Sequence, residues 1–117
     1  MEKTAGRAFY DRQIALLEAR DIAGVAAQQY AADAVIVSFD FTVRGREAIQ
    51  RHFEGYLERL GYIKLVSTDK FTEIDDAIYF EATIEVAAGE AHVYDVFILR
   101  DGQAIRHFTG LTSFTPR

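Results

Sequence analysis

One aspartate and one histidine of this sequence have the residue types and the placement for proton-transfer chemistry. Asp95 is the single charge in an apolar alternation that also contains Val93, Phe97 and Leu99. His107 lies in the strand-like segment that follows. If both side chains face one apolar interior, they can act together as general acid and base, or the carboxylate can orient the imidazole. The alternative is a structural hydrogen bond that fixes the register of the sheet.

The first of two predicted hairpins decides which face Asp95 takes. A turn at Ala88-Gly89 pairs Ala87 with Glu90 and puts Asp95 opposite Ala82. The segment before this turn alternates cleanly between apolar and polar residues, so Asp95 continues its apolar face. That face consists of Ile78, Phe80, Ala82, Ile84 and Val86.

The second hairpin has two possible registers. A two-residue turn at Asp101-Gly102 would point Arg106 into the interior. A loop longer by one residue, with Gly102 in the left-handed conformation, would instead place His107 directly across from Asp95. We expect the longer loop, because it buries a histidine rather than an arginine among apolar neighbours. The inward residues would then be Ile105, His107, Thr109 and Leu111.

Other side chains are expected around the same interior, as contacts for a substrate. The aromatic ones are Tyr10, Phe53, Tyr56, Phe80 and Phe97. The polar ones are Gln13, Ser38, Asp40 and Thr109. Tyr10 and Gln13 share a stripe of the first helix, and a tyrosine hydroxyl there can donate to a developing oxyanion. The three histidines have no metal-ligand spacing, so we expect no metal. His52 lies off the apolar stripe of its helix, so we expect it to be solvated.

The elements that position these residues follow from the hydrophobic period, which changes once, near Gly61. Helical spacing predicts helices over about 4–20, 21–30 and 45–61, with a strand rich in β-branched residues over 34–39 between the last two. Alternation then predicts strands over about 62–74, 78–86, 91–99 and 104–114. The fold class is therefore α+β: a cone-shaped, curved, mixed but mainly antiparallel sheet covered by three N-terminal helices.

Length and composition narrow the classes of function. The 117 residues fit one domain, 1–117, and their hydrophobic half is enough for a packed core. A net charge of −5 makes nucleic acid a poor partner, and no apolar run reaches the length of a membrane span. There is no cysteine, no glycine-rich phosphate loop and no signal-peptide pattern, so we expect no cofactor and a cytoplasmic location. Nine Phe and six Tyr are more rings than a small core needs, and they can line a cavity.

The order of elements resembles the superfamily of nuclear transport factor 2, and within it the SnoaL-like polyketide cyclases and the ketosteroid isomerases. The residues that carry the resemblance are the strand segment 30–37, the helix opening 45–49, and Tyr94-Asp95-Val96-Phe97 in the closing strands. The resemblance covers nearly the whole chain. It implies the cystatin-like α+β barrel, a fold that hosts enzymes, binding modules and scaffold proteins alike.

The resemblance also assigns individual positions. Asp95 falls where ketosteroid isomerases keep a protonated aspartic acid in the oxyanion hole. Ser38 stands where those enzymes have their aspartate base, with Asp40 the nearest acid, and Gln13 stands where they have an oxyanion tyrosine, with Tyr10 one turn away. Two of three signature positions therefore differ, and a related proton-transfer site is implied rather than steroid isomerisation.

These observations predict a small-molecule enzyme of the SnoaL-like type. Asp95 and His107 would be catalytic, by general acid–base chemistry of an isomerase or cyclase kind on an apolar ligand. The alternatives are a non-catalytic module that binds a hydrophobic ligand in the same cavity, and a dimeric scaffold whose interior is filled. A homodimer is expected through an apolar stripe on the outer sheet face, made of Tyr94, Val96, Phe108 and Phe114.

Overall fold

Capping side chains and glycines set the limits of the helices in the computed structural model, which describes residues 3–117. Helix α1 (Ala5–Glu18) begins after Thr4, whose hydroxyl accepts a hydrogen bond from the Arg7 backbone. Helix α2 (Ile22–Gly24) is capped by Asp21 and continues into a π-helical turn, η1 (Val25–Gln29). Helix α3 (Arg46–Leu60) lies between two glycines with positive φ, Gly45 and Gly61.

The strands form one open six-stranded sheet in the order β2-β1-β6-β5-β4-β3. Strand β1 (Tyr30–Val37) pairs parallel with β6 (Gln103–Pro116), and the remaining neighbours pair antiparallel. Those neighbours are β2 (Thr42–Arg44), β3 (Lys64–Ile74), β4 (Ala77–Val86) and β5 (Gly89–Arg100). The α+β class with a curved, mainly antiparallel sheet is confirmed. The sheet does not close into a barrel, because β2 and β3 remain its two edges.

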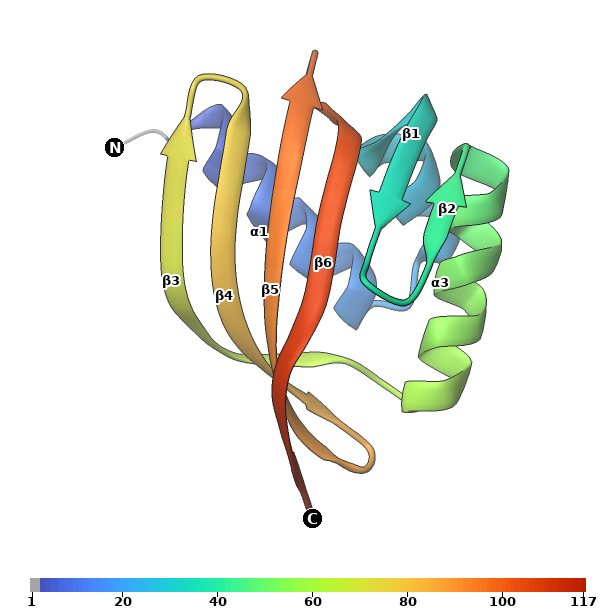
Figure 1. Ribbon diagram of the computed structural model, residues 1–117, viewed down its shortest axis with the longest axis vertical. Helices are drawn as coiled ribbons and strands as arrows, with labels where there is room; N and C mark the ends of the chain where they lie inside the picture. The colour runs from blue at the N-terminus through green and yellow to red at the C-terminus, as the bar shows by residue number, and fades with distance from the viewer. Residues whose placement is uncertain (1–2) are drawn as a thin grey trace.

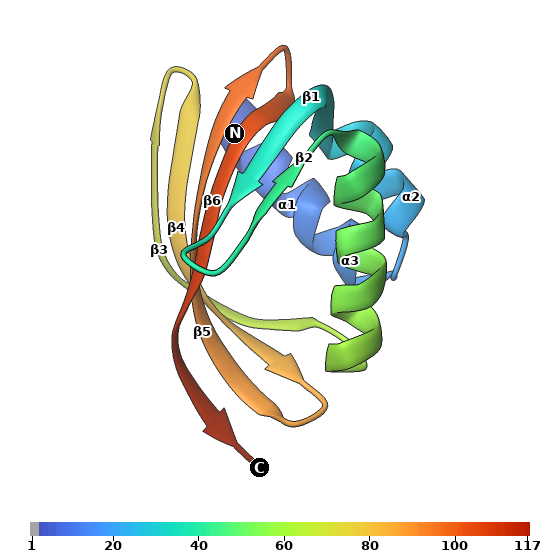
Figure 2. The ribbon, with the colours of Figure 1, turned by 45° about the vertical axis from the view of Figure 1, so that its right-hand side comes forward.

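The helices lie together on one side of the curved sheet (Figures 1 and 2). In Figure 2 the long strands bend beneath them, and α3 stands at the far side of the concave face from β3. Buried residues from both layers form the core, including Phe9 and Tyr10 of α1, Ile49 of α3 and Phe97 of β5. The concave face of the sheet is therefore the interior of the protein.

Three elements differ from the sequence-based expectation. The second helix is a short α-turn joined to a π-turn, and β1 begins at Tyr30, four residues before the predicted 34. Strand β2 was not predicted, because three residues are too few to show an alternation. The earlier start of β1 matters most, since it brings the Tyr30 side chain into the sheet.

The predicted register of the first hairpin is wrong by two residues. The turn is Ala87-Ala88, Val86 pairs with Gly89, and Asp95 therefore lies opposite Phe80 instead of Ala82. Because side chains alternate with a period of two, a shift of two residues leaves each side chain on its predicted face. Asp95 still points into the interior.

The predicted register of the second hairpin is also wrong, although the predicted face of His107 is right. The turn has two residues, with positive φ at both Asp101 and Gly102, as a type I′ turn requires. An extra, unpaired residue, Ile105, then shifts the pairing, so that His107 lies opposite Phe97. This bulge turns His107 inward and sends Arg106 outward, where it is exposed.

A second bulge in β6 changes the predicted outer face. Val93 pairs with Leu111 and His92 with Ser113, so the residue between them is unpaired and the following residues change face. Phe114 consequently lies opposite the buried Ala91, on the inner face. The outer stripe keeps Tyr94, Val96 and Phe108, with Tyr79 beside Val96 on β4. Contact between two copies through this face stays a prediction.

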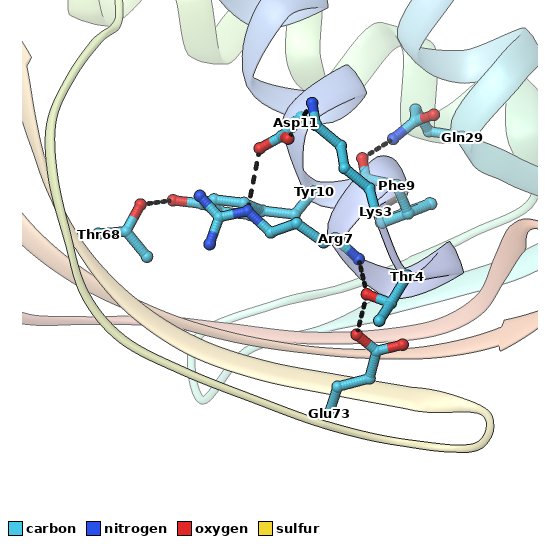
Figure 3. A network of polar contacts seen from close by, with 9 residues as sticks. All are labelled: Lys3, Thr4, Arg7, Phe9, Tyr10, Asp11, Gln29, Thr68 and Glu73. Atoms are coloured by element: carbon cyan, nitrogen blue, oxygen red, sulfur yellow. Dashed lines mark hydrogen bonds and ion pairs between the residues drawn. The ribbon is translucent and has the colours of Figure 1, made fainter. Parts of the chain in front are cut away.

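Thr4 joins the start of α1 to the edge strand β3. Its hydroxyl donates to Glu73 Oε1 at 2.6 Å and accepts from the Arg7 backbone N–H at 3.1 Å, as Figure 3 shows. We expect Thr4→Ala to lower the free energy of unfolding by about 1 kcal/mol, because both bonds are lost. Urea denaturation measures this change. Thr4→Ser keeps both bonds and should retain most of the stability; equal losses in the two variants would contradict the assignment.

Candidate functional site

Asp95 and His107 form a hydrogen-bonded pair on the concave face of the sheet. His107 Nε2 lies 2.7 Å from Asp95 Oδ1, and the two side chains are 13% (Asp95) and 6% (His107) exposed. The pair is diagonal across β5 and β6, since Asp95 lies directly opposite Thr109. The Phe97 ring stacks on the imidazole, with centroids 3.8 Å apart and planes at 19°. The apolar ring therefore fixes the imidazole plane, and the carboxylate occupies one edge of it.

The other edge of the imidazole leads into a chain of buried polar groups. His107 Nδ1 lies 2.8 Å from the Tyr30 hydroxyl, and Gln13 Nε2 donates to that hydroxyl at 3.4 Å. Gln29 Nε2 donates to Gln13 Oε1 at 3.2 Å, and the Arg12 guanidinium donates to Gln29 Oε1 at 2.5 Å. The π-turn η1 ends at Gln29 and so places this side chain beside α1. One continuous hydrogen-bonded path thus joins a surface arginine to the interior carboxylate.

A cavity of about 350 Å³ opens beside this pair. Asp95 and His107 both line it. Of the residues predicted to contact a substrate, the aromatic Phe53, Tyr56, Phe80 and Phe97 line it, and so do the polar Gln13, Ser38, Asp40 and Thr109. Most of the remaining wall is aliphatic, and the volume lies within the range of small-molecule sites. The structure therefore brings nearly the whole predicted set to one place.

Tyr10 is the member of the predicted set that does not line the cavity. Its hydroxyl lies 2.6 Å from Thr68 Oγ1 on β3 (Figure 3), and its ring packs edge-on against Phe80. Burial raises the pKa of the Tyr10 hydroxyl, although the bond to Thr68 opposes this shift. Tyr10 is thus a core residue, because the helix directs it toward the β3 edge while Gln13, nearly one turn later, faces the cavity.

His52 lines the cavity, contrary to the expectation that it is solvated. Its ring lies 4.8 Å from that of Phe41 and stacks on Tyr56 at 5.9 Å. Burial, followed by the charge of Arg59, lowers the pKa of His52. Burial and the negative charge of Asp95 raise the pKa of Tyr56, so that its hydroxyl stays protonated and able to donate. The loop containing Phe41 creates this environment, and helical periodicity gives no sign of it.

Three further residues of the site were missed by the sequence analysis: Tyr30, Gln29 and Arg12. Tyr30 is fully buried, and burial raises the pKa of its hydroxyl well above 10.0. Its position as the first residue of β1, on the buried side, was the available signal. Gln29 and Arg12 gave none, because a glutamine and an arginine at helical positions usually indicate solvated side chains.

Two structural observations concern other classes of function. Within residues 3–117, no three His, Asp or Glu side chains gather closely enough to hold a metal ion. No helix in the same part of the chain is long and apolar enough to cross a membrane.

Solved structures with the same arrangement of elements define the class of this fold. An NTF2-like protein from Anabaena variabilis superposes with a TM-score of 0.81 at 15% identity, covering 93% of this chain and 87% of that one. A proposed polyketide cyclase from Sinorhizobium meliloti gives 0.77 at 14% identity, with 92% and 100% covered. TerC, crystallised with polyporic acid, gives 0.77 at 20% identity, with 92% of each chain covered. The protein therefore has the α+β fold of the NTF2-like superfamily.

The sequence also identifies the family to which this chain belongs. The family model of the SnoaL-like domain matches residues 7–107, and the chain belongs to this family. The match extends from α1 to His107 in β6. Among curated proteins, none matches the sequence.

The lowered pKa of His52 predicts how stability depends on pH. The folded protein holds this imidazole neutral, while the unfolded chain takes up its proton near the ordinary pKa of 6.5. This contribution to stability is complete above that pH and is lost as the pH falls below it. We therefore expect His52→Phe, which cannot titrate, to lose less thermal stability than the wild type between pH 7.5 and 5.5. Circular-dichroism melts at both pH values measure the difference, and equal losses in the two proteins would contradict it.

Proposed function

We propose that this protein is a small-molecule enzyme that moves protons on an apolar, cyclic or polyketide-like ligand, with Asp95 as the base. The observation that carries the proposal is the position of the Asp95 carboxylate. It lines the cavity, and one of its oxygens is held by His107. Within residues 3–117, His107 is its one hydrogen-bond partner, so Oδ2 is left for a ligand. A carboxylate held in this way can accept a proton from a bound carbon acid.

The proposed reaction begins when Asp95 removes a proton from a carbon next to a ligand carbonyl. The electron pair of the broken C–H bond forms a C=C bond, and the π electron pair of the C=O bond moves to the oxygen, which gives an enolate. The Tyr56 hydroxyl, kept protonated by its raised pKa, is the cavity donor suited to hydrogen-bond that oxygen. Asp95 then returns the proton to another carbon of the conjugated enolate. Alternatively, the enolate carbon attacks a second carbonyl carbon of the ligand and closes a ring; the π electron pair of that C=O bond moves to its oxygen, which takes the proton from Asp95.

The family and its structural neighbours support a ligand of this kind. One neighbour is a proposed polyketide cyclase and another, TerC, was crystallised with polyporic acid. The cavity wall here is largely aliphatic and aromatic, and His107 and Thr109 lie next to Asp95 on it. Such a wall favours an apolar ring system that carries one or two polar atoms.

The second candidate is a module that binds the same class of ligand without transforming it. The extensive apolar lining favours it as much as it favours catalysis, because burying an apolar ligand needs no base. The Asp95–His107 pair would then fix the orientation of the ligand. A scaffold with a filled interior is less well supported, since the cavity of about 350 Å³ is not occupied by the protein's own side chains.

A generic proton-abstraction probe tests the role of Asp95 before the natural ligand is known. In 5-nitrobenzisoxazole, removal of one C–H proton by a base breaks the N–O bond and releases a coloured cyanonitrophenolate. We expect the wild type to accelerate this reaction, and Asp95→Asn to lower kcat/KM by about 10²-fold or more. Asparagine can still accept the bond from His107, so the packing of the site should remain intact.

The matched control is Asp33→Asn, which removes an exposed carboxylate of β1 that pairs with Arg100 on the surface. Its kcat/KM should equal that of the wild type. Calorimetry with 5-nitrobenzotriazole, an unreactive analogue, separates the two candidate functions. Affinity that survives Asp95→Asn while turnover is lost supports the enzyme. A wild type that binds the analogue but turns over no probe supports the binding module and overturns the proposal.

A further inference from the structure

The orientation of the Gln29 side-chain amide determines which group donates and which accepts along the buried chain of hydrogen bonds. An arginine guanidinium can only donate, and Arg12 Nε points at one end of the Gln29 amide. A backbone carbonyl can only accept, and Phe9 O lies 3.0 Å from the other end, a contact drawn in Figure 3. Both neighbours require the amide oxygen to face Arg12 and the amide nitrogen to face Phe9. The orientation of the Gln29 amide is therefore determined twice, by independent partners.

The orientation of the Gln29 amide in turn determines the orientation of the Gln13 amide. Gln29 presents an N–H group to Gln13, so the Gln13 atom facing it at 3.2 Å must be the amide oxygen. The opposite orientation would place two N–H groups against each other. The amide nitrogen of Gln13 consequently faces the Tyr30 hydroxyl and donates to its oxygen.

The Tyr30 hydroxyl then determines which nitrogen of His107 carries the proton. Its hydroxyl oxygen accepts from Gln13, and its hydrogen needs an acceptor because the side chain is fully buried. Within residues 3–117 the remaining partner is His107 Nδ1, at 2.8 Å. The hydroxyl keeps its hydrogen at any ordinary pH, since burial raises the pKa of Tyr30 well above 10.0. His107 Nδ1 is thus an acceptor without a proton.

We propose that Gln13 is a positioning residue, which fixes the proton of His107 on Nε2 and so makes the imidazole a hydrogen-bond donor to Asp95. In this state His107 is neutral and Asp95 is the proton acceptor of the pair. Protonation of Nδ1 would break the chain, because Tyr30 and His107 would then both present hydrogens to one another. Gln13, which the cavity lining alone would suggest to be a ligand contact, acts through Tyr30 and His107.

This position of the proton adds detail to the proposed function, and it rests on that proposal where Asp95 is called a base. With the proton fixed on Nε2, the two residues do not share the proton transfers. Asp95 alone exchanges protons with the ligand, and His107 stabilises the carboxylate while it is charged. The position of the proton on His107 follows from the hydrogen bonds alone, whether or not the protein turns over a substrate.

The same protein contains a histidine for which the opposite state is expected. The Thr83 hydroxyl donates to Asp69 Oδ2 at 2.7 Å, and His92 Nδ1 lies 2.9 Å from the hydroxyl oxygen. The single hydrogen of Thr83 is used by the carboxylate, so His92 Nδ1 must carry a proton. His92 therefore serves as an internal reference for His107.

Long-range proton–nitrogen correlation spectra of nitrogen-15-labelled protein at neutral pH read out both rings, because protonated and bare imidazole nitrogens resonate far apart. The expected result is a proton on Nε2 and none on Nδ1 for His107, and a protonated Nδ1 for His92. A protonated Nδ1 on His107 in the wild type overturns the proposal outright.

Two substitutions of Gln13 test whether its side chain sets the tautomer of His107. The carboxylate introduced by Gln13→Glu would only accept, so the Tyr30 hydroxyl would turn toward it and leave its oxygen facing His107. We expect Nδ1 of His107 to gain a proton in this variant, and kcat/KM for 5-nitrobenzisoxazole to fall by at least about tenfold. Gln13→Met removes the N–H group that holds the Tyr30 oxygen without supplying an acceptor, so the preference for the Nε2 tautomer should weaken. The His107 nitrogen signals should then move part of the way toward those of Gln13→Glu, and unchanged signals in both variants would contradict the role of Gln13. If Gln13→Glu leaves the tautomer unchanged while the His92 signals stay in place, Gln13 is not the positioning residue.

The outcomes separate this inference from the proposed function. The expected tautomer in a wild type without turnover supports the positioning role of Gln13 and contradicts the enzyme. Turnover that depends on Asp95, in a protein whose His107 carries its proton on Nδ1, supports the enzyme and contradicts the positioning role. Should Gln13→Glu fail to fold, the wild-type spectrum and Gln13→Met still decide the tautomer.

Discussion

The unpaired residue Ile105 in β6 changes the face of every side chain that follows it up to the next bulge. Without it, the two-residue turn at Asp101-Gly102 would place Arg106 in the interior and His107 in solvent. Burying an unpaired guanidinium among aromatic rings costs several kcal/mol, so the bulge and the apolar interior require each other. The pairing of His107 with Asp95 and its contact with Tyr30 both depend on this local irregularity.

The interior that results holds an unusual amount of polar chemistry for a small core. Glutamine, tyrosine and histidine side chains there are almost fully buried, and each would destabilise the fold if left without a partner. Among the described residues, no buried side-chain polar atom lacks a hydrogen bond. The hydrogen bonds that satisfy these groups join α1, η1, β1, β5 and β6. A fully satisfied network is also rigid, which is what a site that must hold a carboxylate in one place requires.

The interior is packed with aromatic rings under the first half of α1 and is hollow where α3 faces the strands. Under α1, the rings of Phe9, Tyr10 and Phe97 contact one another or their aromatic neighbours and fill the space between the layers. Toward the end of α3, small residues such as Ala82 and Ala91 line the wall, and the cavity opens there. The surplus of aromatic residues thus builds a solid half of the core and one wall of a cavity in the other half.

The sequence by itself determined the α+β class, the helical first half, the four long strands and the inward face of Asp95. These follow from short-range periodicity, which the burial of one face imposes on each element. The tertiary structure alone decided the bulges, the short strand β2, and the gathering of Arg12, Gln29, Gln13 and Tyr30 behind His107. The pairing of β1 with β6 joins residues more than seventy positions apart, such as Tyr30 and Ala104. Periodicity within a segment carries no information about such distant partners, so the polar chain that orients the site exists only in the folded protein.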